Sequence, residues 1–346
     1  ATLYFEPNDS FNAKLRFHTW EDDDGPGAAF GYGVNNGEEL FDCNLPNSTL
    51  AVRSGGGNWF CGEAPFPSAQ YIQYDDEMSP GKVNLLNGVA SPGLTIDTIT
   101  DNPFLDGFGF AREAEQLSLV MNFELSNGIT LTSITASNEN RWMALDDLDR
   151  RATADLGIRD VSLLNGRDLE DFSQEIRITS PQDQRFRWMV GLSKFKFEGK
   201  RTSGFHIFGT VRSLSLGNVF DIETEGYFAA LEYDITDSLT INVEARRQED
   251  EVEEARSSGD EFVSGTFKST TPRVALDYRL NEDITLYASY GEGTRPGGFN
   301  VNLFNQSQTV LDSLAAVGLK KEIDEEELEM IEVGMKASLL NGRAWL

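Results

Sequence analysis

Long apolar runs are the clearest absence in this chain of 346 residues. A membrane-spanning helix needs about 18 or more consecutive apolar residues, and no window of the sequence approaches that length. The sequence therefore excludes a helical membrane protein. A spanning β-strand needs only about 9 to 11 residues, of which every second one is apolar. A mean hydropathy of -0.37 is therefore compatible with a membrane β-barrel.

Histidine, cysteine and positive charge are also scarce. The chain has 2 His and 2 Cys, and it contains no Gly-x-Ser-x-Gly, His-Glu-x-x-His or Cys-x-x-Cys motif. Because nucleophilic and zinc chemistry both lack their parts, we expect no enzyme, no catalytic residue, no metal site and no cofactor. The formal charge of -28 repels a phosphate backbone, which excludes nucleic acid as a partner.

Two features that could suggest chemistry have plainer structural explanations. The Gly-rich segment 291–298 follows a predicted strand, but no helix begins after it and Pro296 lacks a backbone donor, so it is not a phosphate-binding loop. His18 alternates with Lys14 and Arg16. This pattern predicts a polar residue facing the lumen of a barrel rather than a ligand-binding imidazole.

The two cysteines, Cys43 and Cys61, flank three consecutive glycines in a polar region that has no accompanying His cluster. A disulfide within a loop is the favoured interpretation, and a pair of free thiols is the alternative. Closing a loop of this size would stabilise the fold by about 3 kcal/mol. Such a bond requires an oxidising compartment such as the periplasm.

Tight polar turns divide much of the chain into six predicted hairpins. The turns are Pro7-Asn8-Asp9, Ser126-Asn127-Gly128, Gln182-Asp183-Gln184, Thr236-Asp237-Ser238, Asn281-Glu282-Asp283 and Asn341-Gly342-Arg343. The connections between hairpins are much longer, roughly ninety residues for the first and about fifteen to thirty for others. Short turns on one side and long loops on the other are typical of an outer-membrane barrel.

Alternating polarity indicates the strands. In the run 239–246, every odd-numbered residue is apolar and every even-numbered residue is polar. A soluble β-sandwich would show the same alternation, so the loop asymmetry and the strand lengths favour the barrel. Near Ser133 and Ser193 the phase slips, because Ile134 and Phe195 fall out of step, which predicts a β-bulge at each place.

Aromatic residues fall close to the tight turns, where a barrel places its interfacial girdle. They are Phe186, Trp188, Tyr233, Tyr278 and Trp345. Three acidic runs, 21–24, 249–254 and 324–327, are predicted at the opposite strand ends. A solvated loop surface explains these runs. The alternatives are divalent cations that bridge to lipopolysaccharide, or a preference for a cationic ligand. The last run also has helical propensity, but the period-2 pattern from Glu329 onward predicts a strand.

Several segments resemble the barrel strands of TonB-dependent outer-membrane receptors. The segment 172–181, Phe-Ser-Gln-Glu-Ile-Arg-Ile-Thr-Ser-Pro, is similar to a strand motif of that family. The stretch 271–300 is similar to its strand, turn, strand and Gly-rich exit into a loop. Glu332-Val333-Gly334-Met335-Lys336 followed by Asn341-Gly342-Arg343 resembles its Glu-x-Gly-x-Lys strand and turn. The resemblance covers roughly residues 110–346 and, more loosely, the hairpin at 1–20.

The resemblance implies an all-β, antiparallel transmembrane β-barrel, of which this chain would supply about 12 of 22 strands. We expect residues 1–346 to be a partial barrel domain, with long extracellular loops at 21–110 and 295–325. The family also has an N-terminal plug that contacts the TonB complex, and we expect that plug, which is absent here, to lie outside this sequence. The expected location is the outer membrane of a Gram-negative cell, in contact with lipid and lipopolysaccharide.

The resemblance further implies TonB-dependent uptake of a scarce ligand, such as a ferric siderophore or another metal chelate. A passive porin and a glycan-binding β-sandwich are the alternatives. Aromatic and Arg side chains in the expected loops are the candidates for contact with a planar or anionic chelate. These candidates are Trp59, Phe60, Trp142, Phe205, Phe208, Arg295 and Phe299. Loop packing would explain the same residues.

Overall fold

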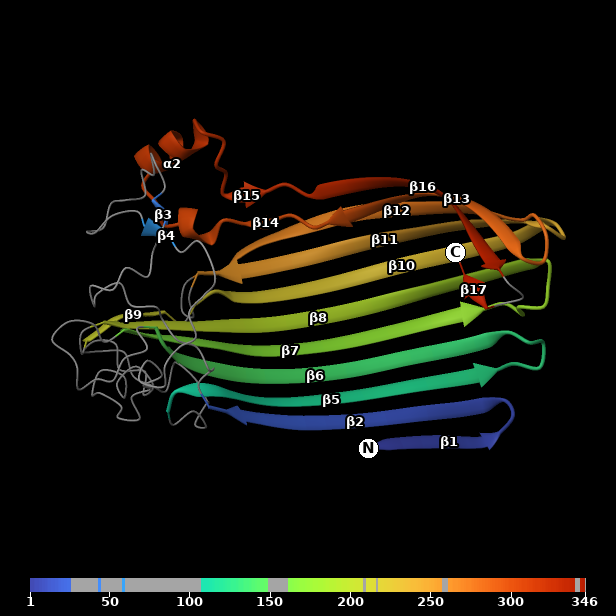
Figure 1. Cartoon of the computed structure of the whole chain (residues 1–346), viewed down its shortest axis with the longest axis horizontal. Coiled ribbons are helices and arrows are strands. Elements are labelled where there is room, and N and C mark those ends of the chain that lie inside the picture. The colour runs from blue at the N-terminus through green and yellow to red at the C-terminus, as the bar shows by residue number, and fades with distance from the viewer. Residues whose placement is uncertain are drawn as a thin grey trace.

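The computed structural model of the chain describes residues 1–25, 43–44, 58–59, 107–148, 161–207, 210–215, 217–256, 261–339 and 343–345. Among these residues, thirteen strands form one antiparallel sheet in the order β1-β2-β5-β6-β7-β8-β10-β11-β12-β13-β16-β17, and β9 pairs with β8. Consecutive strands lie side by side across a curved sheet (Figure 1). The predicted strand number and antiparallel barrel architecture are confirmed.

The strands are long and regular. The strands of the large sheet are β1 (Thr2–Asn8), β2 (Phe11–Asp24), β5 (Gly109–Glu124), β6 (Thr130–Asp147), β7 (Val161–Thr179), β8 (Phe186–Ile207), β9 (Thr210–Ser215), β10 (Val219–Thr236), β11 (Leu239–Ala255), β12 (Val263–Arg279), β13 (Ile284–Arg295), β16 (Glu326–Leu339) and β17 (Ala344–Trp345). Two short pairs lie apart from this sheet: β3 (Cys43–Asn44) with β4 (Asn58–Trp59), and β14 (Gly298–Phe299) with β15 (Glu322–Ile323). No helix in the described part of the chain is long and apolar enough to span a membrane.

The described turns among the predicted ones lie at one end of the sheet, on the right in Figure 1, whereas β8 and β9 meet at the opposite end. The turns after β1, β5, β7, β10 and β12 are the predicted ones, and each joins two neighbouring antiparallel strands. Two residues of the sixth turn, 341 and 342, lie outside the described residues, although β16 and β17 pair on either side of them. The end of the sheet opposite these turns is called the loop side below.

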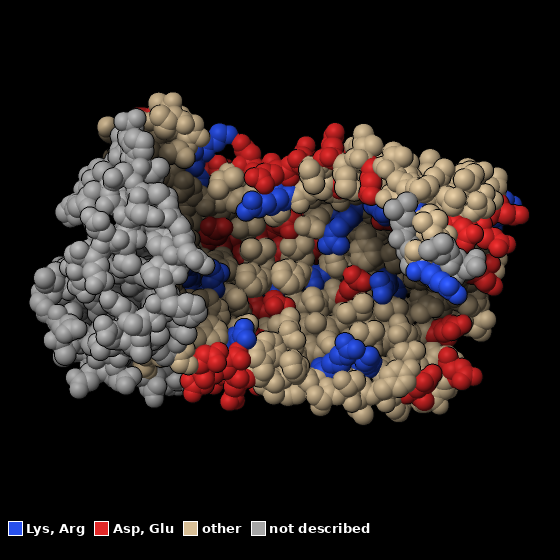
Figure 2. Space-filling view, viewed as in Figure 1, with Lys and Arg blue, Asp and Glu red and all other residues tan. Residues whose placement is uncertain are grey.

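The two faces of the sheet differ in polarity, because directly opposed residues share a face. Near the short turns, one face carries exposed apolar side chains, among them Leu231, Val243 and Leu276. Val243 lies opposite both Leu231 and Val274, so the apolar surface continues across the strands. We call this the outer face. The inner face carries the alternate polar residues, and Figure 2 shows a trough with Lys, Arg, Asp and Glu along it.

The two predicted bulges are wrong. The register runs without a shift through Ser133 and Ser193 on both sides of their strands. Ile134 and Phe195 are out of phase for a different reason: they belong to the inner face, whereas Ser133 and Lys194 take the outer positions. At these two places the apolar side chain moves from the outer face to the inner face. The hydrogen-bonded pairing of the strands stays regular.

Strand ends on the loop side differ from the predicted loop boundaries. The acidic residues 21–24 belong to β2, and β5 begins at Gly109, so the strands extend into the predicted loop 21–110 from both sides. Arg295 is the last residue of β13 rather than a loop residue. β16 begins at Glu326, which confirms the strand predicted after the last acidic run.

The segment between β13 and β16 contains structure that the pattern analysis missed. It holds the short helix η5 (Val301–Leu303) and the α-helix α2 (Gln308–Ala315), which begins after Ser307. Serine is a preferred N-cap residue and could have indicated this helix start. The buried apolar side chains of the chain also gather toward the loop side, with Leu145 and Leu164 opposite each other and both fully buried.

Candidate functional site

The inner face is held by networks of side-chain hydrogen bonds across the strands. Arg246 on β11 donates to Ser193 Oγ (3.1 Å) and to Gln248 Oε1 (2.8 Å). Gln248 in turn donates to both oxygens of Asp250 (2.9 Å), which also accepts a bond from Thr224 Oγ1 (2.7 Å). Asp250 is 4% exposed. A polar, hydrogen-bonded wall suits an aqueous or protein-filled interior rather than a hydrocarbon core.

A second network lies near the short turns. The Arg187 guanidinium binds both carboxylate oxygens of Asp234, at 2.7 and 2.8 Å, and its Nε donates to Glu232 at 2.6 Å. Thr240 Oγ1 donates to the same Asp234 at 2.8 Å. Bidentate pairing of this kind fixes orientation as well as contributing energy, so it ties β8, β10 and β11 together on the inner face.

An aromatic cluster surrounds one cation on the inner face at the loop side. The Arg112 guanidinium lies 5.8 Å from the ring centre of Trp20 and 5.6 Å from that of Phe110. It also binds Asp22, with Nε to Oδ2 at 2.6 Å. Trp142, a predicted ligand residue, packs against Phe110 with ring centres 5.9 Å apart. This cluster, Trp20, Phe110, Arg112 and Trp142, is called the tryptophan cluster.

A row of phenylalanines lies on the inner face of β8 and β10. The ring centres of Phe195 and Phe197 are 6.4 Å apart and nearly parallel, and Phe220 stacks on Phe197 at 5.6 Å. The sequence did not predict this row, because Phe195 falls outside the alternation of the outer face and was interpreted as the sign of a β-bulge. The signal was present in the sequence, since Lys194 and Lys196 alternate with these aromatics and take the outer face.

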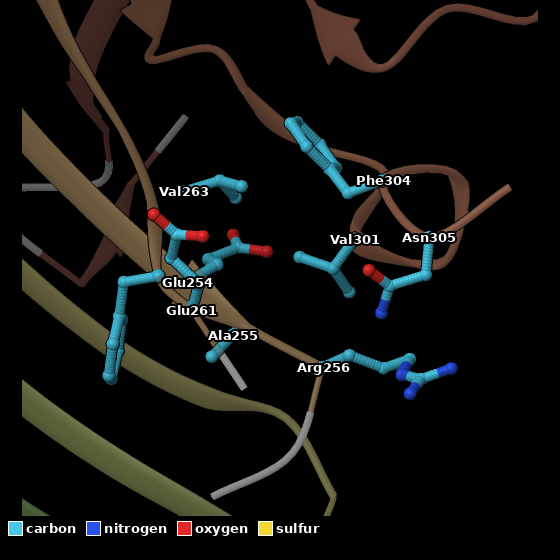
Figure 3. A pocket seen from close by; sticks show the side chains of 9 residues that line it. Glu254, Ala255, Arg256, Glu261, Val263, Val301, Phe304 and Asn305 are labelled. Atoms are coloured by element: carbon cyan, nitrogen blue, oxygen red, sulfur yellow. The ribbon is translucent and has the colours of Figure 1, made fainter. Parts of the chain in front are cut away.

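The third feature is a cavity of about 330 Å³ at the loop side of β11 and β12. The segment after β14 forms its far wall through Val301, Phe304 and Asn305, and Figure 3 shows the carboxylates of Glu254 and Glu261 extending into the space between the walls. Glu254 ends the charged part of β11, beyond the apolar band of the outer face. Burial raises the pKa of its carboxyl.

Phe299, another predicted ligand residue, connects this cavity with the sheet. Its ring centre lies 6.4 Å from that of Phe267 on β12 and 6.2 Å from that of Phe304 on the cavity wall. Lys321 Nζ lies 5.1 Å from the Phe304 ring centre. The two predicted residues Trp142 and Phe299 therefore lie in two separate aromatic clusters.

The outer face changes from apolar to charged toward the loop side. A row of six directly opposed carboxylates crosses it, formed by Glu115, Glu139, Glu170, Glu198, Asp221 and Glu253. Lys196 pairs with Glu198 and approaches Asp221 at 3.7 Å. Charges at this density are incompatible with hydrocarbon, so the row lies beyond the lipid-facing part of the strands. In the described ranges, no group of three or more His, Cys, Asp or Glu could hold a metal ion.

Comparison with known proteins agrees with this geometry. The family described as TonB dependent receptor-like, beta-barrel, matches residues 62–346. This chain belongs to that family. The match begins well before residue 110, where the recognisable motifs started, so it includes part of the segment 21–110 that the sequence predicted to be a loop. A search of curated proteins gave no match.

Solved structures show the same receptor fold at low sequence identity. The ferripyoverdine receptor of the Pseudomonas aeruginosa outer membrane, bound to ferripyoverdine, matches with a TM-score of 0.57 and 15% identity over 99% of this chain and 39% of that one. The ferric yersiniabactin uptake receptor from Yersinia pestis matches with a TM-score of 0.50 and 15% identity, over 67% and 34% of the two chains. The chain thus spans about two fifths or less of these structures. Family and structural neighbours are receptors and transporters, not enzymes.

The other predicted site residues of this receptor barrel do not lie in either aromatic cluster as far as the structure describes them. Phe205 is partly buried near the end of β8, and Arg295 is 79% exposed and lies 3.5 Å from Glu326. Phe60 and Phe208 lie outside the described residues, as does Cys61, and for Trp59 and Cys43 only the strand backbone is described. The ligand roles and the disulfide therefore stay predictions.

Proposed function

We propose that the intact protein is an outer-membrane receptor that takes up a scarce metal chelate, such as a ferric siderophore, by a TonB-dependent mechanism. The observation that carries the proposal is the tryptophan cluster at the loop-side mouth of a polar inner face. Aromatic rings offer flat apolar surfaces to a planar ligand. Arg112 is paired with Asp22, and its remaining N–H donors are available to an anionic group of the ligand. The polar networks below it line a path that water and polar solutes can wet.

The choice of a metal chelate has further support. Two structures of similar fold are a ferripyoverdine receptor and a ferric yersiniabactin uptake receptor, and a third, with a TM-score of 0.51 and 15% identity, is a copper transporter. The proposed partners are the TonB complex, reached through a plug domain, and the lipid and lipopolysaccharide of the outer membrane. A single continuous sheet does not favour the alternative of a glycan-binding sandwich.

Uptake of radioactive iron tests the proposal. The full-length protein is produced in a Gram-negative host that lacks its own ferric-chelate receptors, and cells are given ⁵⁵Fe bound to hydroxamate, catecholate or mixed chelators. We expect accumulation of at least one class, abolished by a protonophore. Uptake that resists the protonophore would instead indicate a passive porin. No uptake of any chelate, together with expression unchanged by iron starvation, would contradict the proposal.

A further inference from the structure

The cavity beside Glu254 is lined by two glutamates, whereas the tryptophan cluster is built around an arginine. Glu254 lies at the end of β11, opposite Val263 on β12, and its side chain is partly buried. Glu261, an exposed residue that precedes β12, enters the same space, so a carboxylate from the end of β11 and one from the segment before β12 face one cavity (Figure 3). Two negative charges in a confined space repel each other unless a positive group lies between them.

The opposite wall is apolar and firmly placed. Val301 is 6% exposed, and Phe304 is held against Phe299. Asn305 adds an amide at the rim. Apolar walls of this kind accept the methylene stem of a long cationic side chain, while the charged head reaches the polar groups.

Among the described residues beside the cavity, two cations, Arg256 and Lys321, take other positions than the space between the two carboxylates. Figure 3 shows the Arg256 side chain extending along the rim, away from Glu254 and Glu261. Lys321 lies over the Phe304 ring. The burial that raises the pKa of Glu254 also removes water that would otherwise screen its charge. A cation that enters here therefore meets the Glu254 carboxylate with reduced competition from solvent, and the exposed Glu261 carboxylate supplies a second acceptor.

From this arrangement we infer that the cavity is a subsite for a cationic group of the ligand, an ammonium or guanidinium carried on an aliphatic stem. The inference rests on the proposed function as a receptor, and it narrows the ligand to a chelate or peptide that bears such a side chain. The volume of about 330 Å³ is ample for one butylguanidinium group and its hydration. Arg112 in the tryptophan cluster would then meet a different, anionic part of the same ligand.

Butylguanidinium, a guanidinium on a four-carbon stem, is a suitable probe, and butylurea is its neutral counterpart. Binding of each to the full-length protein in lipid nanodiscs is measured by saturation-transfer difference NMR. We expect butylguanidinium to bind about tenfold or more tightly than butylurea, since charge-assisted hydrogen bonds exceed neutral ones by that order. The double substitution Glu254→Gln and Glu261→Gln should remove this preference.

Glu251→Gln is the matched control, because Glu251 lies on the same strand but is exposed on the outer face. It should leave butylguanidinium binding unchanged. Equal binding of butylguanidinium and butylurea, absence of butylguanidinium binding, or an unaltered preference in the double variant would each overturn the inference. Heat-modifiable migration of every variant on gels checks that the barrel is folded.

Iron uptake by the same variants separates the two proposals. Butylguanidinium binding without uptake of any ferric chelate would refute the proposed function and leave the cation subsite standing. Uptake without a preference for butylguanidinium over butylurea would refute only the subsite.

Discussion

Phe228 on β10 lies directly opposite Gly191 on β8, and its ring fills the space that a Cβ atom at Gly191 would occupy. The relationship recurs. Phe220 covers Gly199 in the same pair of strands, and Tyr287 covers Gly334 between β13 and β16. Each aromatic ring thereby extends over the glycine opposite it on the inner face, and that glycine supplies the clearance.

The first prediction concerns this pairing. Gly191→Ala should lower the free energy of unfolding by about 1–3 kcal/mol, because the added methyl group meets both the Phe228 ring and the carbonyl of Ile176. Gly293→Ala is the control, since nothing lies within 4 Å of a Cβ atom built there. Urea unfolding of the full-length protein in detergent micelles gives both values. Equal losses in the two variants would contradict the packing argument.

The second prediction places the lipid boundary. Val243→Arg puts a charge in the apolar band of the outer face, where we expect a cost of about 2–4 kcal/mol. Glu251→Arg lies farther along β11 on the same face, within its charged part, and should cost about 0–1 kcal/mol. Unfolding in lipid vesicles measures both. A cost at Glu251 that matches the one at Val243 would mean that hydrocarbon reaches the charged rows.

The third prediction tests the inner network. Asp250→Ala removes the acceptor of Thr224 and Gln248 and leaves two donors unpaired at a buried position. The free energy of unfolding should fall by about 1–3 kcal/mol. Glu249→Ala, at the neighbouring outer position paired with exposed Lys268, should change it by less than about 1 kcal/mol. Urea unfolding of both variants measures these losses. A larger loss of stability in Glu249→Ala than in Asp250→Ala would contradict the prediction.

The fourth prediction concerns the tryptophan cluster and rests on the proposed function. Trp142→Ala should raise the half-saturating concentration for ⁵⁵Fe-chelate uptake by about tenfold, the equivalent of one aromatic contact. Trp142→Phe should retain most of the affinity. Trp188→Ala removes a tryptophan from the outer face near the short turns and should leave the half-saturating concentration unchanged. An identical response of both tryptophans would point to a general effect on folding.

The fifth prediction concerns the cysteine pair. If Cys43 and Cys61 form the expected disulfide, the protein purified without reductant should not react with maleimide under denaturing conditions. After reduction it should gain the mass of two maleimide groups. Modification without prior reduction would instead show free thiols.

Much of the fold could be predicted because its determinants are local. Polar turn residues such as Asn127 and Gly128 fix where a hairpin reverses, and the alternation in 239–246 fixes which residues share a face. These signals do not depend on distant parts of the chain. The charged loop-side ends and the inward position of His18 follow from the same alternation.

The candidate site could not be predicted in the same way. Trp142 and Phe299 were selected as aromatic loop residues, yet each acquires its neighbours from strands distant in sequence: Trp142 from Phe110, and Phe299 from Phe267. The break in alternation at Phe195 marked an aromatic residue on the inner face. It could not be distinguished from a bulge until the pairing of β8 with its neighbours was known.

The sequence by itself determined the strands, the turns and the polarity of their two faces, since these depend on spacing along one segment. Only the tertiary structure decided which side chains meet. Register brings six carboxylates into one row and places Phe228 over Gly191. The return of the segment around Val301 against Glu254 creates a cavity. Contacts of this kind depend on distances between residues far apart in the chain, which no local pattern specifies.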